Sequence, residues 1–356
     1  YYINIVNDQA VLRRLIQSCR DIDHHFLNDE ITDVNGFILD SETLLKDACE
    51  KRRVSGFRKA GQVAEAVKMS IETPKEVKTD GVNGLTTGFD SINKITQGFH
   101  AGDMIIVAAR PSVGKTALAL NFAYRAANRT NKPVAIFSLE MPAEQLITRL
   151  IGTESSVSLS KITTGNLVGV DRAKVSTAIS RIGSLPIYID DSPNGKLMDI
   201  IAKSRKLQAN EPDLGLIIID YLGLVSSGSN KSSDSRQEEV RKASLALKAL
   251  ARELKVPIIV VSQLSRSVEQ HGENKRPILS DLRDSGSIEQ DADVVMLLYR
   301  EDYYTKQISI DENTSKSEFI IAKHRSGPTT TVDLIFRRNV STFVNMLKEQ
   351  QWESAY

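Results

Sequence analysis

The stretch IIVAARPSVGKTALAL, residues 105–120, joins an apolar run, a short loop and the start of a helical pattern. A loop that ends in Gly-Lys-Thr before a helix presents backbone N–H groups to phosphate at the positive end of the helix dipole. In this pattern the Lys115 side chain reaches the β- and γ-phosphates, and the Thr116 hydroxyl holds Mg²⁺. The sequence therefore predicts a nucleotide site built from Ala109, Ser112, Val113, Gly114, Lys115, Thr116 and Ala117.

One position of this loop departs from the usual pattern, because Ala109 stands where the first glycine is expected. A methyl group fits there if the backbone keeps a negative φ. The alternative interpretation is a glycine-bearing turn between strand and helix that carries an exposed lysine. The strand before the loop and the helix after it favour the nucleotide site.

Three polar residues follow other apolar runs and are further candidates for this site. Asp220 ends LGLIIID, where an acidic residue orders Mg²⁺ beside the phosphate loop, although it could instead cap the next element. Glu140 follows IFSL and could deprotonate a water, or be a favourable charge at a helix N-terminus. Gln263 ends another run and could sense the γ-phosphate, or be an ordinary polar residue at a strand end.

Outward from the loop, the chain from Leu85 onward alternates apolar runs with helical patterns. The runs are continuous rather than alternating, as expected for strands of a parallel sheet buried on both faces. Residues 236–254 carry apolar side chains every three or four positions, which indicates an amphipathic helix. The class is α/β, with strands expected at 104–109, 134–139, 186–190, 214–220, 257–262, 294–299 and 318–324.

The first part of the chain differs in character. Residues 1 to about 72 are charged and helical in pattern, with a second helix from 60 to 71. The polar stretch ETPKEVKTDGVNG, residues 72–84, is rich in charge, proline and glycine and is typical of a linker.

Composition limits the class of protein. The 356 residues carry a net charge of only +1, so any surface for nucleic acid must be local. The two cysteines, Cys19 and Cys49, match no metal-binding spacing and fit a reducing compartment. Neither a membrane-spanning run nor a signal peptide is recognisable, so we expect a soluble, cytoplasmic chain.

Six motifs in order give the chain a family resemblance. AARPSVGKTALALN, IFSLEM, IIIDYLGL, VVSQLSRSVEQ, LSDLRDSGSIEQDADVVMLLYR and IIAKHRSGP resemble the DnaB-type replicative helicases, hexameric RecA-like motors that unwind DNA at the fork. The likeness spans about Leu85 to Phe343. It implies three parts. Residues 1–58 would be the C-terminal part of the family's helical N-terminal collar domain and the start of the linker, and residues 59–84 the linker helix and linker. Residues 85–356 would be a RecA-like ATPase domain with a parallel-rich sheet.

The resemblance also implies roles for individual residues. Lys115 and Thr116 would contact the phosphates of ATP and Mg²⁺, Glu140 would be the catalytic base, and Asp220 would support the metal. Gln263 matches the γ-phosphate sensor. The family further places Arg149 near the nucleotide base, and Lys323 and Arg325 as a pair that reaches into the adjacent subunit's site.

The resemblance implies that three residues contact single-stranded DNA, and a fourth candidate comes from the composition of its loop. Arg283, Asp284 and Gly286 match the loop that holds the DNA backbone in the central channel, and Lys231 lies in a Ser/Gly-rich loop that could line the channel or lie on the surface. The chain departs from the family at Asp284, where glutamate is usual, and at Thr330, which replaces a glycine after the finger motif.

The resemblance implies a homo-hexamer that moves 5′ to 3′ on DNA in the cytoplasm of a bacterial cell, encoded by the cell or by a phage. Expected partners are single-stranded DNA at the replication fork, a DnaG-type primase and a helicase loader. Two alternatives are a RecA-like recombinase that coats DNA and exchanges strands, and an ATP-gated scaffold for primase or loader. A P-loop kinase fits less well, because nothing indicates a lid or a small-molecule acceptor pocket.

Overall fold

The computed structural model describes residues 2–28, 37, 41, 44–45, 48, 59–72, 81–192, 195–220, 236–270, 275–282, 286–305 and 313–346. These belong to two compact units, Tyr1–Glu76 and Val77–Tyr356. The first unit contains helices α1 (Tyr2–Asn28) and α3 (Ala60–Glu72).

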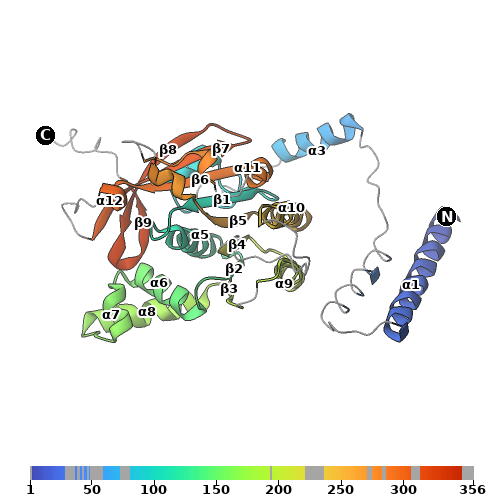
Figure 1. The fold of residues 1–356 in the computed structure, drawn as a ribbon, viewed down its shortest axis with the longest axis horizontal. Coiled ribbons are helices and arrows are strands. Elements are labelled where there is room, and N and C mark those ends of the chain that lie inside the picture. Colours follow the sequence, from blue (N-terminus) through green and yellow to red (C-terminus); the bar gives the residue numbers. More distant parts are fainter. Residues whose placement is uncertain are drawn as a thin grey trace. The chain divides into compact units, whose positions relative to one another are not determined.

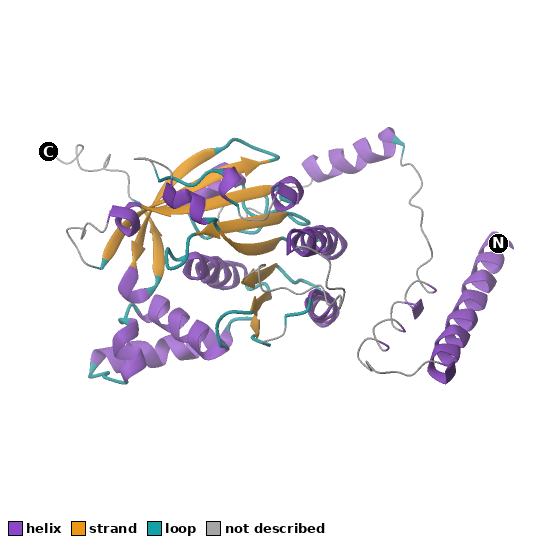
Figure 2. Cartoon of the chain, in the orientation of Figure 1, coloured by secondary structure: helices purple, strands orange, loops and turns teal. Residues whose placement is uncertain are grey.

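The second unit alternates strands and helices over most of its length (Figures 1 and 2). Its strands are β1 (Met104–Ala109), β2 (Val134–Ser138), β3 (Ile187–Asp190), β4 (Leu216–Asp220), β5 (Ile258–Gln263), β6 (Val294–Arg300), β7 (Thr314–His324), β8 (Thr330–Arg337) and β9 (Thr342–Asn345). Its α-helices are α4 (Asp90–Thr96), α5 (Lys115–Thr130), α6 (Ala143–Ser155), α7 (Leu159–Thr164), α8 (Val170–Ser184), α9 (Leu197–Asn210), α10 (Arg236–Leu254), α11 (Gly286–Asp291) and α12 (Glu301–Thr305), and short 3₁₀ turns include η2 (Arg266–Gln270), η3 (Leu279–Asp281) and η4 (Arg338–Val340).

The strands form one mixed sheet in the order β3-β2-β4-β5-β1-β6-β7-β8-β9. From β3 to β6 the neighbours are parallel, and from β6 to β9 they are antiparallel. β1 lies between β5 and β6, and all six of its residues are buried. A strand covered on both faces must be apolar at every position, which is why the run at 104–109 is continuous.

Helices cover both faces of the parallel part of the sheet (Figure 1). One face packs against Leu118 and Phe122 of α5 and Leu146 of α6. The other face packs against α9 and α10, with Leu247 of α10 fully buried. Phe122 makes edge-to-face contacts with the rings of Phe89 and Phe99, at centroid distances of 5.5 and 5.2 Å.

The α/β class and all seven expected strands are confirmed, as is the amphipathic helix at 236–254. Strands β8 and β9 were not expected. β8 alternates buried and exposed residues at its centre and β9 has four residues, so neither produces the continuous apolar run of a doubly covered strand.

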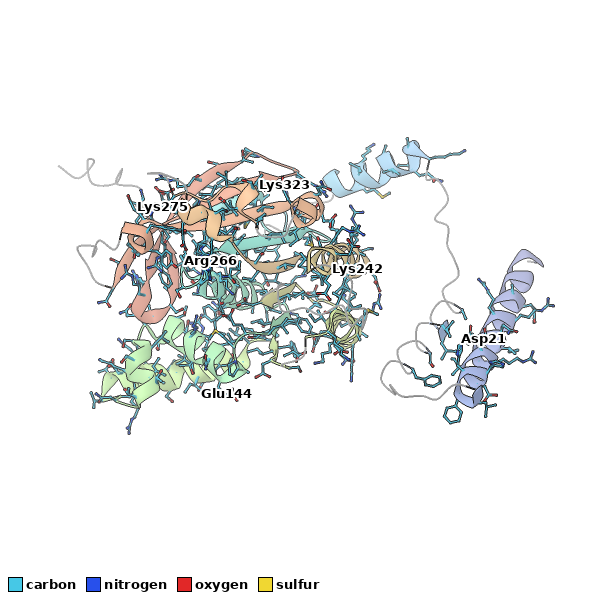
Figure 3. All side chains as sticks on the ribbon, in the orientation of Figure 1. Asp21, Glu144, Lys242, Arg266, Lys275 and Lys323 are labelled. Carbon is cyan, nitrogen blue, oxygen red and sulfur yellow. The ribbon has the colours of Figure 1, made fainter. Side chains whose placement is uncertain are left out.

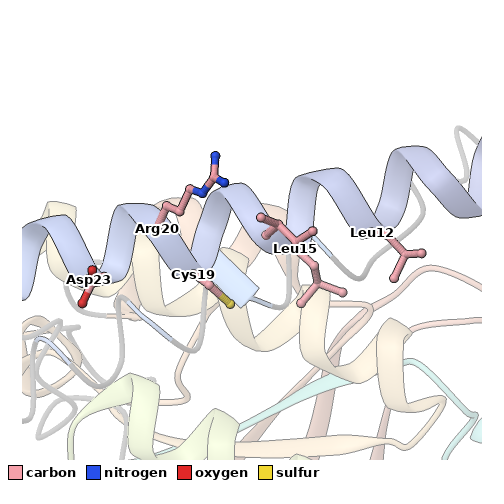
Figure 4. Close-up of a pocket in the computed structure, with 6 residues that line it drawn as sticks. Leu12, Leu15, Cys19, Arg20 and Asp23 are labelled. Atoms are coloured by element: carbon pink, nitrogen blue, oxygen red, sulfur yellow. The ribbon is translucent and has the colours of Figure 1, made fainter.

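Each helix of the first unit leaves apolar side chains exposed. On α1, Leu12 and Ile16 border a shallow depression of about 460 Å³, whose described lining lies entirely on that helix (Figure 4). On α3, Val67 and Met69 are 52% and 68% exposed. In the described part of the chain, no helix combines the length and apolar character needed to cross a membrane.

Candidate nucleotide and coupling site

The loop between β1 and α5 has the backbone of a phosphate cradle. Ser112 and Gly114 take positive φ values of 64° and 119°, and the Val113 N–H donates to the Arg110 carbonyl at 3.3 Å. α5 begins after Gly114 without a side-chain cap, so its first N–H groups face the loop. Ala109 ends β1 and is absent from the positive-φ positions, so the alanine in the first glycine position fits without strain.

Lys115 lies at the centre of the site. Its Nζ is 2.8 Å from Glu140 Oε2 and 3.1 Å from Asp220 Oδ1, and only 8% of the residue is exposed. Burial is the largest influence and acts to lower the pKa of Lys115, but Asp220 and Glu140 together outweigh it and the pKa is raised. The lysine therefore carries a full positive charge where phosphate would bind.

Thr116 and Asp220 form an oxygen pair beside that charge. The Thr116 hydroxyl donates to Asp220 Oδ2 at 2.5 Å. Asp220 is held at the end of β4 by the β2–β4 register, in which it pairs with Ser138, and by the Leu139 N–H, which donates to its carbonyl at 2.7 Å. Hydroxyl and carboxylate oxygens are the ligands that Mg²⁺ prefers. No group of three or more His, Cys, Asp or Glu that could hold a metal ion occurs among the described residues, and Mg²⁺ in phosphate sites needs only one or two protein ligands.

Glu140 lies two residues past the end of β2, in a turn shaped by Ser138. The Ser138 hydroxyl donates to the Met141 carbonyl at 2.6 Å and accepts the Met141 N–H at 3.3 Å. The Glu140 side chain is 49% exposed. A half-exposed carboxylate beside Lys115 can reach a water in front of the phosphate loop.

Arg149 and Gln263 complete the predicted nucleotide residues. Burial is the largest influence on Arg149 and lowers its pKa, although the negative charges of Asp220 and Glu140 act to raise it. This α6 side chain is therefore close enough to both carboxylates to interact with them electrostatically. Gln263 ends β5 directly opposite Ala109 in the parallel register. The five predicted residues at strand ends or on α5 thus meet at the carboxyl edge of the sheet: Lys115, Thr116, Glu140, Asp220 and Gln263.

Sequence reasoning left two arginines at this loop unassigned: Arg110 is the first residue of the loop, and Arg300 contacts it. Arg110 is 7% exposed, donates to the Leu264 carbonyl at 3.0 Å and pairs with Glu269 of η2 at 2.5 Å. Arg300, at the end of β6, donates to the Val113 carbonyl at 3.1 Å. The sequence does contain a pattern that could have identified such residues: a cation that directly follows a buried apolar run, as Arg300 does in VVMLLYR. A buried cation needs partners, so this pattern predicts contacts at the strand end.

Lys323 and Arg325 lie at the other edge of the sheet. His324 pairs with Val294 at the amino end of β6, which runs parallel to β1. The seven residues of β6 separate this end from the phosphate loop by roughly 20 Å, at about 3.3 Å per residue. The structure therefore does not bring these two side chains to the phosphate loop of their own chain.

At that edge both cations contact the C-terminal end of α11; Lys323 is labelled in Figure 3. Lys323 Nζ donates to the Glu289 carbonyl at 2.5 Å, and Arg325 Nη2 donates to the Gln290 carbonyl at 2.5 Å. Arg325 also pairs with Asp293 at 2.9 Å. Cations near a helix C-terminus interact favourably with its carbonyl groups.

The predicted DNA contacts are described only in part. Gly286 is the first residue of α11, whereas Lys231, Arg283 and Asp284 lie outside the described residues. Thr330, the other departure from the family pattern, opens β8 and pairs with Ile321 of β7.

Comparisons of sequence and of structure match this chain to the same family of proteins. A profile of the DnaB-like helicase C-terminal domain matches residues 84–345. Replicative DNA helicase DnaC of Bacillus subtilis strain 168 is 44% identical over 357 residues, covering 100% of this chain and 76% of that protein. Replicative DNA helicase DnaB of Geobacillus stearothermophilus is 45% identical over 363 residues, with the same coverage. A solved structure described as a DnaB-like replicative helicase and its interactions with primase aligns with a TM-score of 0.80 and 34% identity, covering 97% of this chain and 78% of that one.

Proposed function

The chain belongs to the DnaB-like helicase family, and from this premise we propose that it is a replicative DNA helicase driven by ATP and Mg²⁺. Six copies would form a ring that moves 5′ to 3′ on single-stranded DNA and unwinds the duplex at the fork. One observation carries the proposal: the side chains predicted to handle phosphate lie at one edge of the sheet, and the cations Lys323 and Arg325 lie at the opposite edge, in contact with α11.

Within one chain, the side chains at the carboxyl edge divide the chemistry. Lys115 would move from its carboxylate partners to the β- and γ-phosphates, because a phosphate group offers it more negative charge. Glu140, released from Lys115, would accept a proton from the attacking water. Thr116 and Asp220 would hold Mg²⁺, which supplies charge neutralisation at the transferring phosphate. Arg149 would face the nucleotide near its base.

Between chains, Lys323 and Arg325 would complete the neighbour's site. They lie about 20 Å from their own phosphate loop, so a contact with γ-phosphate requires a second copy. Head-to-tail contacts of this kind form a ring when the rotation between subunits closes, as the proposed hexamer requires. An arginine finger is worth about 10³ to 10⁵ in rate. The exposed apolar residues Val67 and Met69 of α3 are suited to docking on an adjacent copy.

Coupling to DNA would pass through α11. This helix begins at Gly286, where the predicted DNA loop ends, and its last carbonyls bond Lys323 and Arg325. When the finger pair moves to a neighbour's phosphate, those two contacts are lost and the end of α11 is freed. Contacts of Arg283, Asp284, Gly286 and Lys231 with the DNA backbone would make binding tolerant of sequence and sensitive to salt.

Partners follow from the family. A related solved structure is described with primase interactions, and we extend a DnaG-type primase, together with a helicase loader, to this chain in the cytoplasm of a bacterial cell. The decisive experiment is ATP-dependent unwinding of forked duplexes that carry either a free 5′ tail or a free 3′ tail, with Lys115→Ala as the inactive control. Strand displacement that requires the 5′ tail is expected. ATP turnover without displacement from either fork would reject the helicase function.

A further inference from the structure

Arg300 is a buried arginine that faces the phosphate loop from the end of β6. It is 6% exposed, and its Nη1 donates to the Val113 carbonyl at 3.1 Å. Its other nitrogens are occupied: Nη2 donates to Asp302 Oδ2 at 2.9 Å and Nε to the Ser315 hydroxyl at 3.1 Å. The guanidinium carbon lies 5.0 Å from the centroid of the Phe336 ring. The side chain is thereby held in one orientation.

The contact with Val113 determines how the next peptide faces. In a trans peptide the C=O and the following N–H point in opposite directions. A Val113 carbonyl turned toward Arg300 therefore directs the Gly114 N–H away from Arg300 and into the cradle beside Lys115. We propose that Arg300 is a positioning residue for nucleotide, which keeps the Gly114 N–H available to a phosphate oxygen. This inference rests on the proposed function, because it requires that the loop bind phosphate.

Gly114 needs such a restraint because of its backbone. Its φ of 119° and ψ of 21° lie in a region that glycine enters and leaves at little cost. A flipped peptide would turn the Val113 carbonyl, with its partial negative charge, toward the phosphate. Packing restricts where Gly114 lies but does not set the direction of its N–H. A Cβ on Gly114 would lie 3.2 Å from Phe343 Cζ, so the stacked rings of Phe343 and Phe336 pack against this part of the loop.

The cost of burying this charge also indicates a role beyond packing. An apolar side chain of similar volume usually stabilises a core as well as a buried ion pair does. Asp302 balances the charge of Arg300 and also accepts from Arg338. Arg338, on η4, bonds the same carboxylate, whereas the bond to the Val113 carbonyl is made by Arg300. Arg338 therefore separates the structural role of the cluster from the positioning role.

The test compares Arg300→Met, Arg300→Lys and the matched control Arg338→Ala in the full chain. Binding of fluorescent ADP, the KM and kcat for ATP, and the urea midpoint are measured for each. We expect Arg300→Met to raise the Kd for ADP and the KM for ATP by about tenfold or more, because one hydrogen bond to a charged phosphate is lost. The kcat at saturating ATP should change much less. Arg300→Lys keeps one donor near Val113 and should recover part of the affinity, whereas Arg338→Ala should stay within about twofold of wild type.

An unchanged Kd in Arg300→Met, with a stability loss like that of Arg338→Ala, would make Arg300 a structural anchor and overturn the inference. If Arg300→Met fails to fold, Arg300→Leu decides, because it too has no donor for the Val113 carbonyl: a folded leucine variant with wild-type Kd and KM overturns the inference equally. Wild-type protein that binds no ADP would instead reject the proposed nucleotide site itself, so the two failures are distinguishable.

Discussion

Replacement of Arg325 by alanine separates a catalytic from a structural role most sharply. The side chain forms an ion pair with Asp293 at 2.9 Å while 42% exposed, and donates to the Gln290 carbonyl. An ion pair this exposed contributes at most about 1 kcal/mol to stability. A finger acting on a neighbour's γ-phosphate contributes about 10³ to 10⁵ in rate, or roughly 4–7 kcal/mol of barrier at 1.36 kcal/mol per tenfold. The expected loss of hydrolysis is therefore far larger than the loss of stability.

Asp293→Asn is the matched control for this variant. This variant keeps the Arg325 guanidinium but removes the charge of the carboxylate that pairs with it. The Asp293 carboxylate also accepts the Met104 N–H at 2.8 Å and pairs with the Lys248 ammonium. Because Asp293 is buried and makes three such contacts, this change should cost about 1–3 kcal/mol, more than Arg325→Ala. If hydrolysis followed stability, Asp293→Asn would be the less active variant. The finger role predicts the opposite order.

The assay measures ATP turnover with single-stranded DNA, first for each variant and then for a 1:1 mixture of Arg325→Ala with Lys115→Ala chains. In a mixed ring, half of the subunits are Arg325→Ala chains, whose phosphate loops are intact. About half of these have a Lys115→Ala neighbour that still carries its Arg325, so about a quarter of all ATP sites should regain activity. Each variant alone should be inactive. Wild-type turnover by Arg325→Ala, or a mixture no more active than its components, would refute a finger that acts between subunits.

Three further outcomes follow from the described contacts. Glu140→Gln should still bind nucleotide but lose at least about 100-fold in turnover, measured by single-turnover hydrolysis; full turnover would remove it as the base. Phe122→Ala should lower the free energy of unfolding by about 3–5 kcal/mol, since Phe122 is fully buried against Phe89, and urea titration checks this against the exposed Leu245→Ala. Burial would raise the pKa of Asp302, but its arginine and serine partners lower it below the ordinary 3.8. Its stabilising contribution is therefore present at neutral pH and lost on acidification below about pH 5, and Asp302→Asn should flatten the acid limb of a thermal unfolding series; an identical limb would contradict the shift.

Local sequence alone was sufficient for much of this protein. Strands buried on both faces must be apolar at each position, so β1 could be predicted from MIIVAA without knowledge of its neighbours. The Gly-Lys-Thr loop is likewise a local device, because the backbone of a few consecutive residues forms the cradle. The tolerance of Ala109 was predictable from the same local rule and is confirmed by its place at the end of β1.

Tertiary structure alone decided which distant residues meet. The sheet order brings Asp220 beside Lys115 and Gln263 opposite Ala109. The spacing of residues along the chain does not predict that strand order. The bond from Arg300 to Val113 crosses 187 positions, and strand direction places Arg325 about 20 Å from its own phosphate loop. Register and direction arise from the packing of whole strands against one another, so a polar residue at a strand end is recognisable in sequence, whereas its partner is determined only by the folded sheet.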